Sequence, residues 1–327
     1  MPIHDEVASR FPLLDGIASL HEAMGDPDKD RRVREFMEPP MDPPPVVPTR
    51  DLVVDGPHGP VPVRVYGDPD GTDRPALVWI HGGAFMFGDL DMPEADWTAR
   101  EVCARSGAVV VSVDYRLAVG GVHHPVPLDD CVAAARWVRD HAEELGVDRG
   151  RISVGGGSAG GNLATATALR LRDEDAWQPA ALIPVYPVLH PALPKPSTEV
   201  AALLEEVPPA LRFTPQGTAG INANYLGGQA ADGYSVPALA DLTGVAPTLV
   251  VTAEYDDLRT TGEAFAELLR EAGGDVRLVQ ADGMLHGFLI LSASLGPVDD
   301  VLDLVARTVA AVPALHTRGQ ELSLIHI

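Results

Sequence analysis

Basic side chains are scarce in this sequence of 327 residues, and lysine is nearly absent. Lysine and arginine together number 24 against 47 aspartates and glutamates, which gives a formal net charge of −23. The only lysines are Lys29 and Lys195. Because such a chain repels phosphates and anionic headgroups, its charge argues against nucleic acids and membrane surfaces as partners.

Long hydrophobic runs are missing as well, and there are only two cysteines. No apolar run approaches the ~20 residues of a membrane span, and residues 1–10 contain acids where a signal peptide needs an apolar core. We therefore expect no membrane span and a cytoplasmic location. The two cysteines, Cys103 and Cys131, should be reduced and buried. His123 and His124 are adjacent, so their side chains diverge, and we expect no metal site and no cofactor.

What the sequence does contain is an alternation of short apolar strands with helical runs such as 126–145. With 46% hydrophobic residues, the chain can bury one sizeable core. Strands are expected at 51–55, 61–66, 76–80, 109–113, 152–154, 181–186, 248–253 and 276–280. This pattern predicts an α/β fold with a mainly parallel, eight-stranded sheet flanked by helices.

Two segments interrupt this alternation: residues 1–50, which end in a proline-rich linker, and residues 188–235. Residues 322–327 follow a helix that should stop near Pro313, so we leave them aside as a candidate non-native tail. The expected division of the chain is an N-terminal segment 1–50, a core 51–187, an insertion 188–235, a second core part 236–315 and a tail 316–327.

The most informative stretch is a G-x-S-x-G sequence at residues 156–160, between an expected strand and an alanine-rich helix. It predicts a strained strand-to-helix turn that exposes Ser158 as a nucleophile. One alternative is a plain glycine-rich turn. Another is a dinucleotide fingerprint, because the same glycines also spell G-x-G-x-x-G, but that motif needs an acid closing the next strand, which here ends in Tyr-Pro.

A serine nucleophile needs a base and an acid that orients the base. His286 lies in a glycine-flanked loop after the last expected strand and is the candidate base. Asp256 and Asp257 both follow the strand at 248–253. From the residues alone either could be the acid, while the other caps the following helix.

The serine also needs donors for a developing oxyanion. An apolar strand runs into His-Gly-Gly at residues 81–83. The candidate donors are the backbone N–H groups of Gly82 and Gly83, together with that of Ala159 after the nucleophile.

Taken together, five motifs resemble the bacterial hormone-sensitive-lipase-like (family IV) carboxylesterases of the α/β-hydrolase superfamily. They are HGGAF at 81–85, DYRLA at 114–118, GGSAGGN at 156–162, DDLR at 256–259 and HGF at 286–288. The resemblance implies an α/β-hydrolase fold with a helical cap built from the N-terminal segment and the insertion. It also implies Asp256 as the acid, with Gly82, Gly83 and Ala159 as oxyanion donors.

The sequence departs from the family pattern at three places. Gly157 stands where the family usually has aspartate, immediately before the nucleophile. Residues 118–120 read Ala-Val-Gly in place of Ala-Pro-Glu, and Thr260 replaces a second aspartate. None of these changes removes Ser158, Asp256 or His286.

We therefore expect a serine carboxylic-ester hydrolase that acts on short to medium acyl esters through an acyl-enzyme intermediate. The expected substrate pocket is lined by Phe85, Phe87, Leu258, Phe213 and Tyr225. The same site would also suit an amidase, a lactonase, a carbamate hydrolase or a lyase, and the fold also serves non-catalytic small-molecule receptors.

The expected partner is a small-molecule ester. The resemblance also implies a homodimer, with residues 276–280 and 301–312 near its interface.

Overall fold

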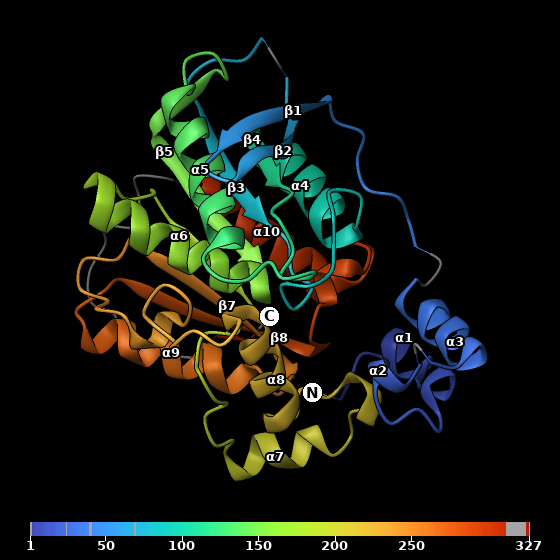
Figure 1. Ribbon diagram of the computed structural model, residues 1–327. Helices are drawn as coiled ribbons and strands as arrows, with labels where there is room; N and C mark the ends of the chain where they lie inside the picture. The colour runs from blue at the N-terminus through green and yellow to red at the C-terminus, as the bar shows by residue number, and fades with distance from the viewer. Residues whose placement is uncertain (1, 24, 39–40, 69, 312–324, 327) are drawn as a thin grey trace.

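The computed structural model describes residues 2–23, 25–38, 41–68, 70–311 and 325–326, arranged around one β-sheet (Figure 1). The strand order is β1-β2-β4-β3-β5-β6-β7-β8-β9. β2 pairs antiparallel with β1 and with β4, and every other pair is parallel. The strands are β1 (Thr49–Gly56), β2 (Gly59–Tyr66), β3 (Arg74–Ile80), β4 (Val109–Val113), β5 (Val147–Gly157), β6 (Leu182–Val185), β7 (Thr248–Tyr255), β8 (Val276–Leu285) and β9 (Ile325–His326).

All eight strands expected from the sequence are present as β1 to β8, so the predicted fold class is confirmed. β9 adds two residues that pair with Val279 and Gln280 of β8. An edge strand such as β8 offers unpaired N–H and C=O groups to any short segment, so this pairing leaves residues 322–327 a candidate non-native tail. Residues 312–324 and 327 lie outside the described residues.

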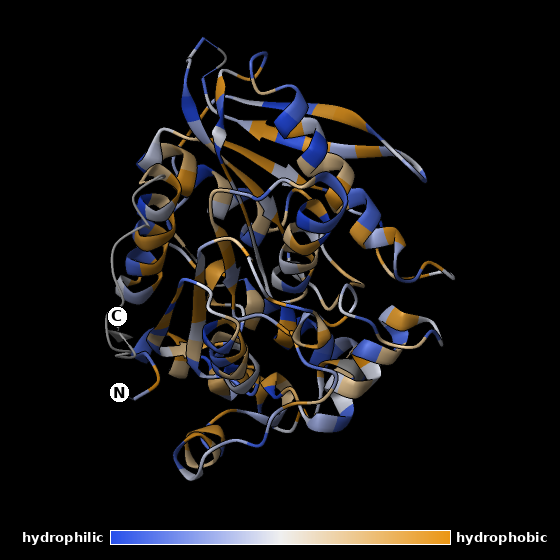
Figure 2. Cartoon of the chain, turned by 90° about the vertical axis from the view of Figure 1, so that its left-hand side faces the viewer, coloured by the Kyte–Doolittle hydropathy of each residue, from blue (hydrophilic) through white to orange (hydrophobic). Residues whose placement is uncertain are grey.

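Helices cover both faces of the sheet. α5 (Val126–Asp140), α6 (Ala159–Asp175) and α9 (Arg259–Glu271) bury their apolar sides in the core on one face, and α4 (Pro93–Ser106) and α10 (Gly296–Ala310) do so on the other. Hydrophobic colour dominates the strands between these layers in Figure 2. Because helices cover both of their faces, β4 and β7 are buried at every residue.

Two groups of short helices lie outside these layers. One precedes β1 and the other follows β6. A small buried cluster joins Leu14, Ile17 and Ala23 of the first group to Ala210 of the second, so the two segments pack together (Figure 1). The first group is α1 (Asp5–Ala8), η1 (Phe11–Leu14), α2 (Leu20–Ala23) and α3 (Pro27–Met37), the second is α7 (Thr198–Leu204), η2 (Pro209–Leu211) and α8 (Pro215–Leu226), and the single turns η3 (Pro237–Leu239) and η4 (Phe288–Ile290) come later.

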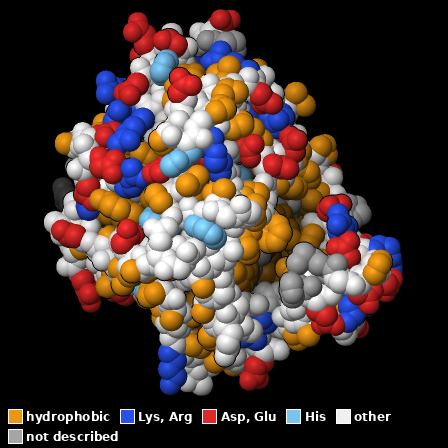
Figure 3. Space-filling model, viewed as in Figure 1, with side chains coloured by type: hydrophobic (Ala, Val, Ile, Leu, Met, Phe, Trp, Pro, Cys, Tyr) orange, Lys and Arg blue, Asp and Glu red, His pale blue; other side chains and the backbone are white. Residues whose placement is uncertain are grey.

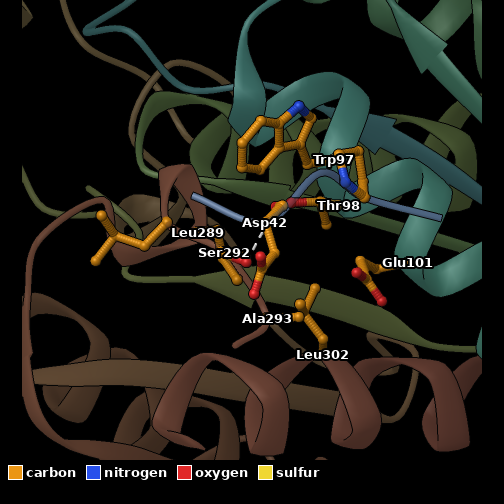
Figure 4. A pocket seen from close by; sticks show the side chains of 10 residues that line it. Asp42, Trp97, Thr98, Glu101, Leu289, Ser292, Ala293 and Leu302 are labelled. Carbon is orange, nitrogen blue, oxygen red and sulfur yellow. Dashed lines mark hydrogen bonds between the residues drawn. The ribbon is translucent and has the colours of Figure 1, made fainter. Parts of the chain in front are cut away.

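The chain between α3 and β1 runs along the side of the molecule beside α4. Ser292 Oγ donates a hydrogen bond to the Asp42 carbonyl oxygen at 3.2 Å, and Figure 4 shows Asp42 at a small hollow with Trp97 of α4 and Leu302 of α10. In Figure 3, hydrophobic side chains gather in a recess between the main body and the N-terminal helices on the right. The N-terminal segment is thus tied to the core before the first strand begins.

The sequence predicted reduced, buried cysteines and no membrane-spanning helix. Cys103 on α4 and Cys131 on α5 are both buried and free, as expected. Throughout the described ranges, every helix is too short or too polar to span a bilayer.

The carboxylate of Asp175 joins α6 to α5 through ion pairs, and these pairs should make the stability depend on pH. Asp175 accepts hydrogen bonds from Arg136 at 2.7 Å and from Arg139 at 2.6 Å. The Arg136 hydrogen bond is the main cause that lowers the pKa of Asp175 to about 2. Because the folded pKa lies below the unfolded value, this contribution is present above pH ~4 and is lost as the pH falls towards 2.

We expect Asp175→Asn to lower the free energy of unfolding at pH 7 by about 1 kcal/mol, since solvent screens the pair. Urea unfolding at a series of pH values would measure this, and the difference from the unmodified chain should shrink below pH ~4. A difference that stays constant down to pH ~3 would contradict the ion-pair explanation.

Candidate active site

Ser158 lies in a tight turn between the end of β5 and the first residue of α6. Its backbone has φ +54° and ψ −118°, a conformation that L residues rarely adopt. A Cβ on Gly156 or on Gly160 would overlap the Ile80 carbonyl oxygen, so both positions require glycine. The strained backbone and its glycines agree with the strand-to-helix turn predicted from the sequence.

His286 connects Ser158 to a buried carboxylate. His286 Nε2 lies 2.9 Å from Ser158 Oγ, and His286 Nδ1 lies 2.7 Å from Asp256 Oδ2. The other carboxylate oxygen of Asp256 accepts a hydrogen bond from Leu258 N–H at 2.9 Å. The three side chains come from the carboxyl ends of β5, β7 and β8, where parallel strands deliver their loops to one edge of the sheet.

The neighbouring aspartate faces a different partner. Asp257 forms an ion pair with Arg212 at 2.8 Å and accepts a hydrogen bond from Phe213 N–H at 2.9 Å. It therefore holds the segment between η2 and α8 against the core. Of the two aspartates that the residues alone left open, the one in contact with the imidazole is Asp256.

The loop after β3 offers backbone donors near the nucleophile, although not all of the predicted ones are available. Gly82 N–H donates to Glu94 Oε1. Across the described part of the chain, the N–H groups of Gly83, Ala84 and Ala159 have no protein acceptor. Gly83 has φ +107°, and a Cβ there would overlap the Phe87 carbonyl oxygen.

Sequence reasoning missed Glu94, which lies beneath this loop. It occupies the first turn of α4 and is only 3% exposed. Its second carboxylate oxygen accepts a hydrogen bond from the Tyr186 hydroxyl at 2.9 Å, and the Tyr186 ring lies 5.0 Å from the His286 ring. An acid after Pro93 is typical of an exposed helix start, so the sequence pattern carried no signal for a buried role.

Burial changes the proton affinities of these groups. Burial raises the pKa of Glu94 above its ordinary value, although the hydrogen bonds from Gly82 and Tyr186 oppose this shift. Burial holds the pKa of Tyr186 well above 10, so its hydroxyl stays neutral and able to donate. Burial lowers the pKa of His81 to about 4, so this imidazole, which stacks on Tyr115, is neutral at pH 7.

The five predicted pocket residues differ in burial and in their distance from the base. The Phe213 ring lies 4.4 Å from the His286 ring, edge to face. Phe85 and Tyr225 stack on each other with 3.9 Å between centroids, and both are buried, as is Leu258. Phe87 is 55% exposed.

The adjacent histidines take part in packing around α8. His123 Nδ1 donates to the Asn224 carbonyl oxygen at 2.8 Å, while His124 Nδ1 lies 3.3 Å from the Tyr225 hydroxyl. Among the described residues, no group of three or more His, Cys, Asp or Glu side chains is arranged to hold a metal ion.

Comparison with known proteins places this geometry in a family context. A family model described as an alpha/beta hydrolase fold matches residues 77–290. Esterase LipI of Mycobacterium tuberculosis is 33% identical over 302 residues, which cover 88% of this chain and 86% of the relative. Carboxylesterase NlhH of the same organism is 37% identical over 242 residues, which cover 70% of this chain and 71% of the relative.

Solved structures agree with these relatives. A hyperthermophilic esterase from the archaeon Pyrobaculum calidifontis superposes with a TM-score of 0.79 at 30% sequence identity. The superposition covers 95% of this chain and 99% of that one. The resemblance therefore extends well beyond the nucleophile and its neighbours.

Proposed function

Since this chain belongs to the alpha/beta hydrolase family that matches residues 77–290, it is a carboxylesterase, and we propose that Ser158, His286 and Asp256 carry its reaction. The observation that supports these roles is the unbroken chain of hydrogen bonds from Ser158 Oγ through the imidazole to Asp256 Oδ2. It contains a nucleophile, a base and a buried acid in the order that acyl transfer needs.

In the first half of the proposed reaction, Ser158 Oγ attacks the ester carbonyl carbon while its proton passes to His286 Nε2. Asp256 accepts the Nδ1–H hydrogen bond, which keeps Nε2 free to act as the base and stabilises the imidazolium that forms. His286 then protonates the leaving alcohol. In the second half, the same imidazole takes a proton from water as the water attacks the acyl-enzyme, and it returns that proton to Ser158 Oγ as the acid is released.

The oxyanion of each tetrahedral intermediate needs preorganised N–H donors. We propose Gly83, Ala84 and Ala159 for this role, because their N–H groups have no acceptor among the described residues. Gly82 was expected to be one of the donors, but its N–H can join them only by leaving Glu94. Gly82 is therefore proposed as a support of the loop.

The test of this function is hydrolysis of p-nitrophenyl butyrate followed by covalent labelling. We expect a p-nitrophenyl phosphonate to abolish the activity and to add its phosphonyl group to the peptide that contains Ser158. Activity that survives complete phosphonylation of Ser158 would contradict the proposed nucleophile. A label found only on another residue would do so as well.

We further propose that residues 1–50 and 188–235 form a cap that limits the length of the acyl chain. The support is the packing of Leu14 and Ile17 against Ala210, and the position of Phe213 against the base. Phe213 would then line the acyl pocket, with the exposed Phe87 at its entrance, while the fully buried Phe85, Leu258 and Tyr225 would support this wall from behind.

This cap predicts a preference among p-nitrophenyl esters of increasing acyl length. We expect kcat/KM to be highest for short to medium chains and to fall beyond about ten carbons, because a capped site leaves a longer chain without an apolar wall. Initial rates from acetate to palmitate would measure this. A steady rise through palmitate would contradict the proposed pocket.

A cytoplasmic location and a homodimer through residues 276–280 and 301–312 are also proposals, supported by the sequence and by the family resemblance. Light scattering after gel filtration tests the homodimer. A mass near 34.6 kDa, that of one chain, would contradict it.

A further inference from the structure

Glu94 is a buried carboxylate that touches two parts of the candidate site without a hydrogen bond to the nucleophile oxygen. One carboxylate oxygen accepts the N–H of Gly82 on the loop after β3. The other accepts the hydroxyl of Tyr186, whose ring lies edge to face against the imidazole of His286. The same side chain thus connects the oxyanion loop to the surroundings of the base.

The carboxylate also fills the space beside the nucleophile. A Cβ at Gly157 would lie 2.7 Å from the Glu94 carboxyl carbon and 2.8 Å from both of its oxygens. A Cβ at Gly82 would lie 2.8 Å from the nearer oxygen and 3.1 Å from Ser158 Cβ. Residues 82 and 157 therefore have no room for a side chain while Glu94 is in place. The presence of glycine at residue 157, before the nucleophile, is thus explained by Glu94 on α4.

The backbone of Glu94 is held in place by a contact with the sheet. Its own carbonyl oxygen accepts a hydrogen bond from the Trp79 indole at 2.9 Å, and Trp79 belongs to β3, the strand that leads into the oxyanion loop. The position in the first turn of α4 also places the carboxylate at the positive end of a helix dipole. The helix, the strand and the loop are therefore held in a fixed relation around one side chain.

We propose that Glu94 is a positioning residue for ester hydrolysis: its carboxylate holds the oxyanion loop and Tyr186 together, in the space that a side chain at residue 157 would otherwise occupy. This inference rests on the proposed function. Because it acts on the donors of the oxyanion, it affects the transition state more than the bound substrate.

The first test compares two variants of Glu94 with a control on the same helix. We expect Glu94→Ala to lower kcat for p-nitrophenyl butyrate by about 100-fold, with KM changed by no more than about twofold, because loop donors act mainly in the transition state. Glu94→Gln keeps the shape and loses one favourable hydrogen bond, so a loss of about 10-fold is expected. Glu101→Gln, also on α4, should retain the activity of the unmodified chain.

The burst of p-nitrophenol counts active sites, so kcat is compared per folded enzyme even where a variant is less stable. Glu94→Gln provides the answer if Glu94→Ala does not fold. A kcat within about twofold of the unmodified chain for the folded Glu94 variants would overturn the inference, since loss of an oxyanion contact costs far more.

The second test moves the carboxylate from residue 94 to residue 157. Gly157→Asp alone should lower kcat by about 100-fold or more, because it forces a second acid against Glu94. Adding Glu94→Ala to Gly157→Asp vacates that space, and we expect kcat to rise about 10-fold above Gly157→Asp alone. A double variant no more active than Gly157→Asp, at equal folded content by circular dichroism, would overturn the shared-space explanation.

These outcomes separate this inference from the proposed function. If Ser158→Ala hydrolyses the ester as fast as the unmodified chain, the proposed function fails. If Ser158 is required but the Glu94 variants keep full kcat, only the positioning role of Glu94 fails.

Discussion

Ser158→Ala is expected to lower kcat for p-nitrophenyl butyrate by about 10⁴- to 10⁶-fold, the largest effect of any single change in this chain. The variant keeps the backbone turn but removes the oxygen that lies 2.9 Å from His286 Nε2. Without this nucleophile no acyl-enzyme can form, and the remaining rate depends on water and the oxyanion donors. Stopped assays at high enzyme concentration would measure the residual rate.

A serine on the strand that leads into the Ser158 turn is a matched control. Ser153 on β5 is fully buried, and its hydroxyl has no hydrogen-bond partner among the described residues. We therefore expect Ser153→Ala to keep kcat within about twofold, because it removes no reacting group. Equal losses in Ser153→Ala and Ser158→Ala would point to a general effect on folding and would count against Ser158 as the nucleophile.

The second large effect is expected for Asp256→Asn, with kcat lowered by about 10⁴-fold. An asparagine amide can donate to His286 Nδ1, which favours the imidazole tautomer with its proton on Nε2. That tautomer cannot accept the Ser158 proton. The acid is also only 2% exposed, so its carboxylate is shielded from solvent. Steady-state kinetics with p-nitrophenyl butyrate would measure the loss.

The adjacent aspartate gives a control of the same type. Asp257→Asn weakens the ion pair with Arg212 and the hydrogen bond from Phe213 N–H, and Phe213 is one of the residues of the proposed acyl pocket. We expect KM to rise and kcat to fall by less than about 10-fold, because this contact positions a wall and no reacting atom. An Asp257→Asn variant with the larger loss of kcat would reverse the proposed roles of the two acids.

Several features of the fold could be predicted because they depend on local patterns. Apolar runs bounded by turns mark strands that a sheet buries on both faces, and all eight were located in this way. The strand-to-helix turn at Ser158 could be predicted because only glycine fits beside Ile80 at residues 156 and 160. Strand ends were less accurate, since β5 and β8 extend well past their predicted bounds where neighbouring strands continue to pair.

The parts that could not be predicted depend on contacts between distant segments. The sequence shows only that residue 157, before the nucleophile, has no side chain. The structure shows that the space for such a side chain is filled by Glu94, more than 60 residues away in the sequence. The His-Gly-Gly motif at residues 81–83 predicted Gly82 as an oxyanion donor, whereas its N–H donates to the same acid. The position of Phe87 on the surface also has no local signal.

The sequence by itself determined the order of strands and helices, the strained serine turn and two of the three side chains proposed for catalysis, Ser158 and His286. These follow from short-range sterics and from hydrophobic periodicity, which act within a few residues. Only the tertiary structure decided which aspartate meets the imidazole, which N–H groups are free of acceptors and why residue 157 has no side chain. Those outcomes are set by packing and hydrogen bonding between segments far apart in the chain, where the local pattern contains no information about the partner.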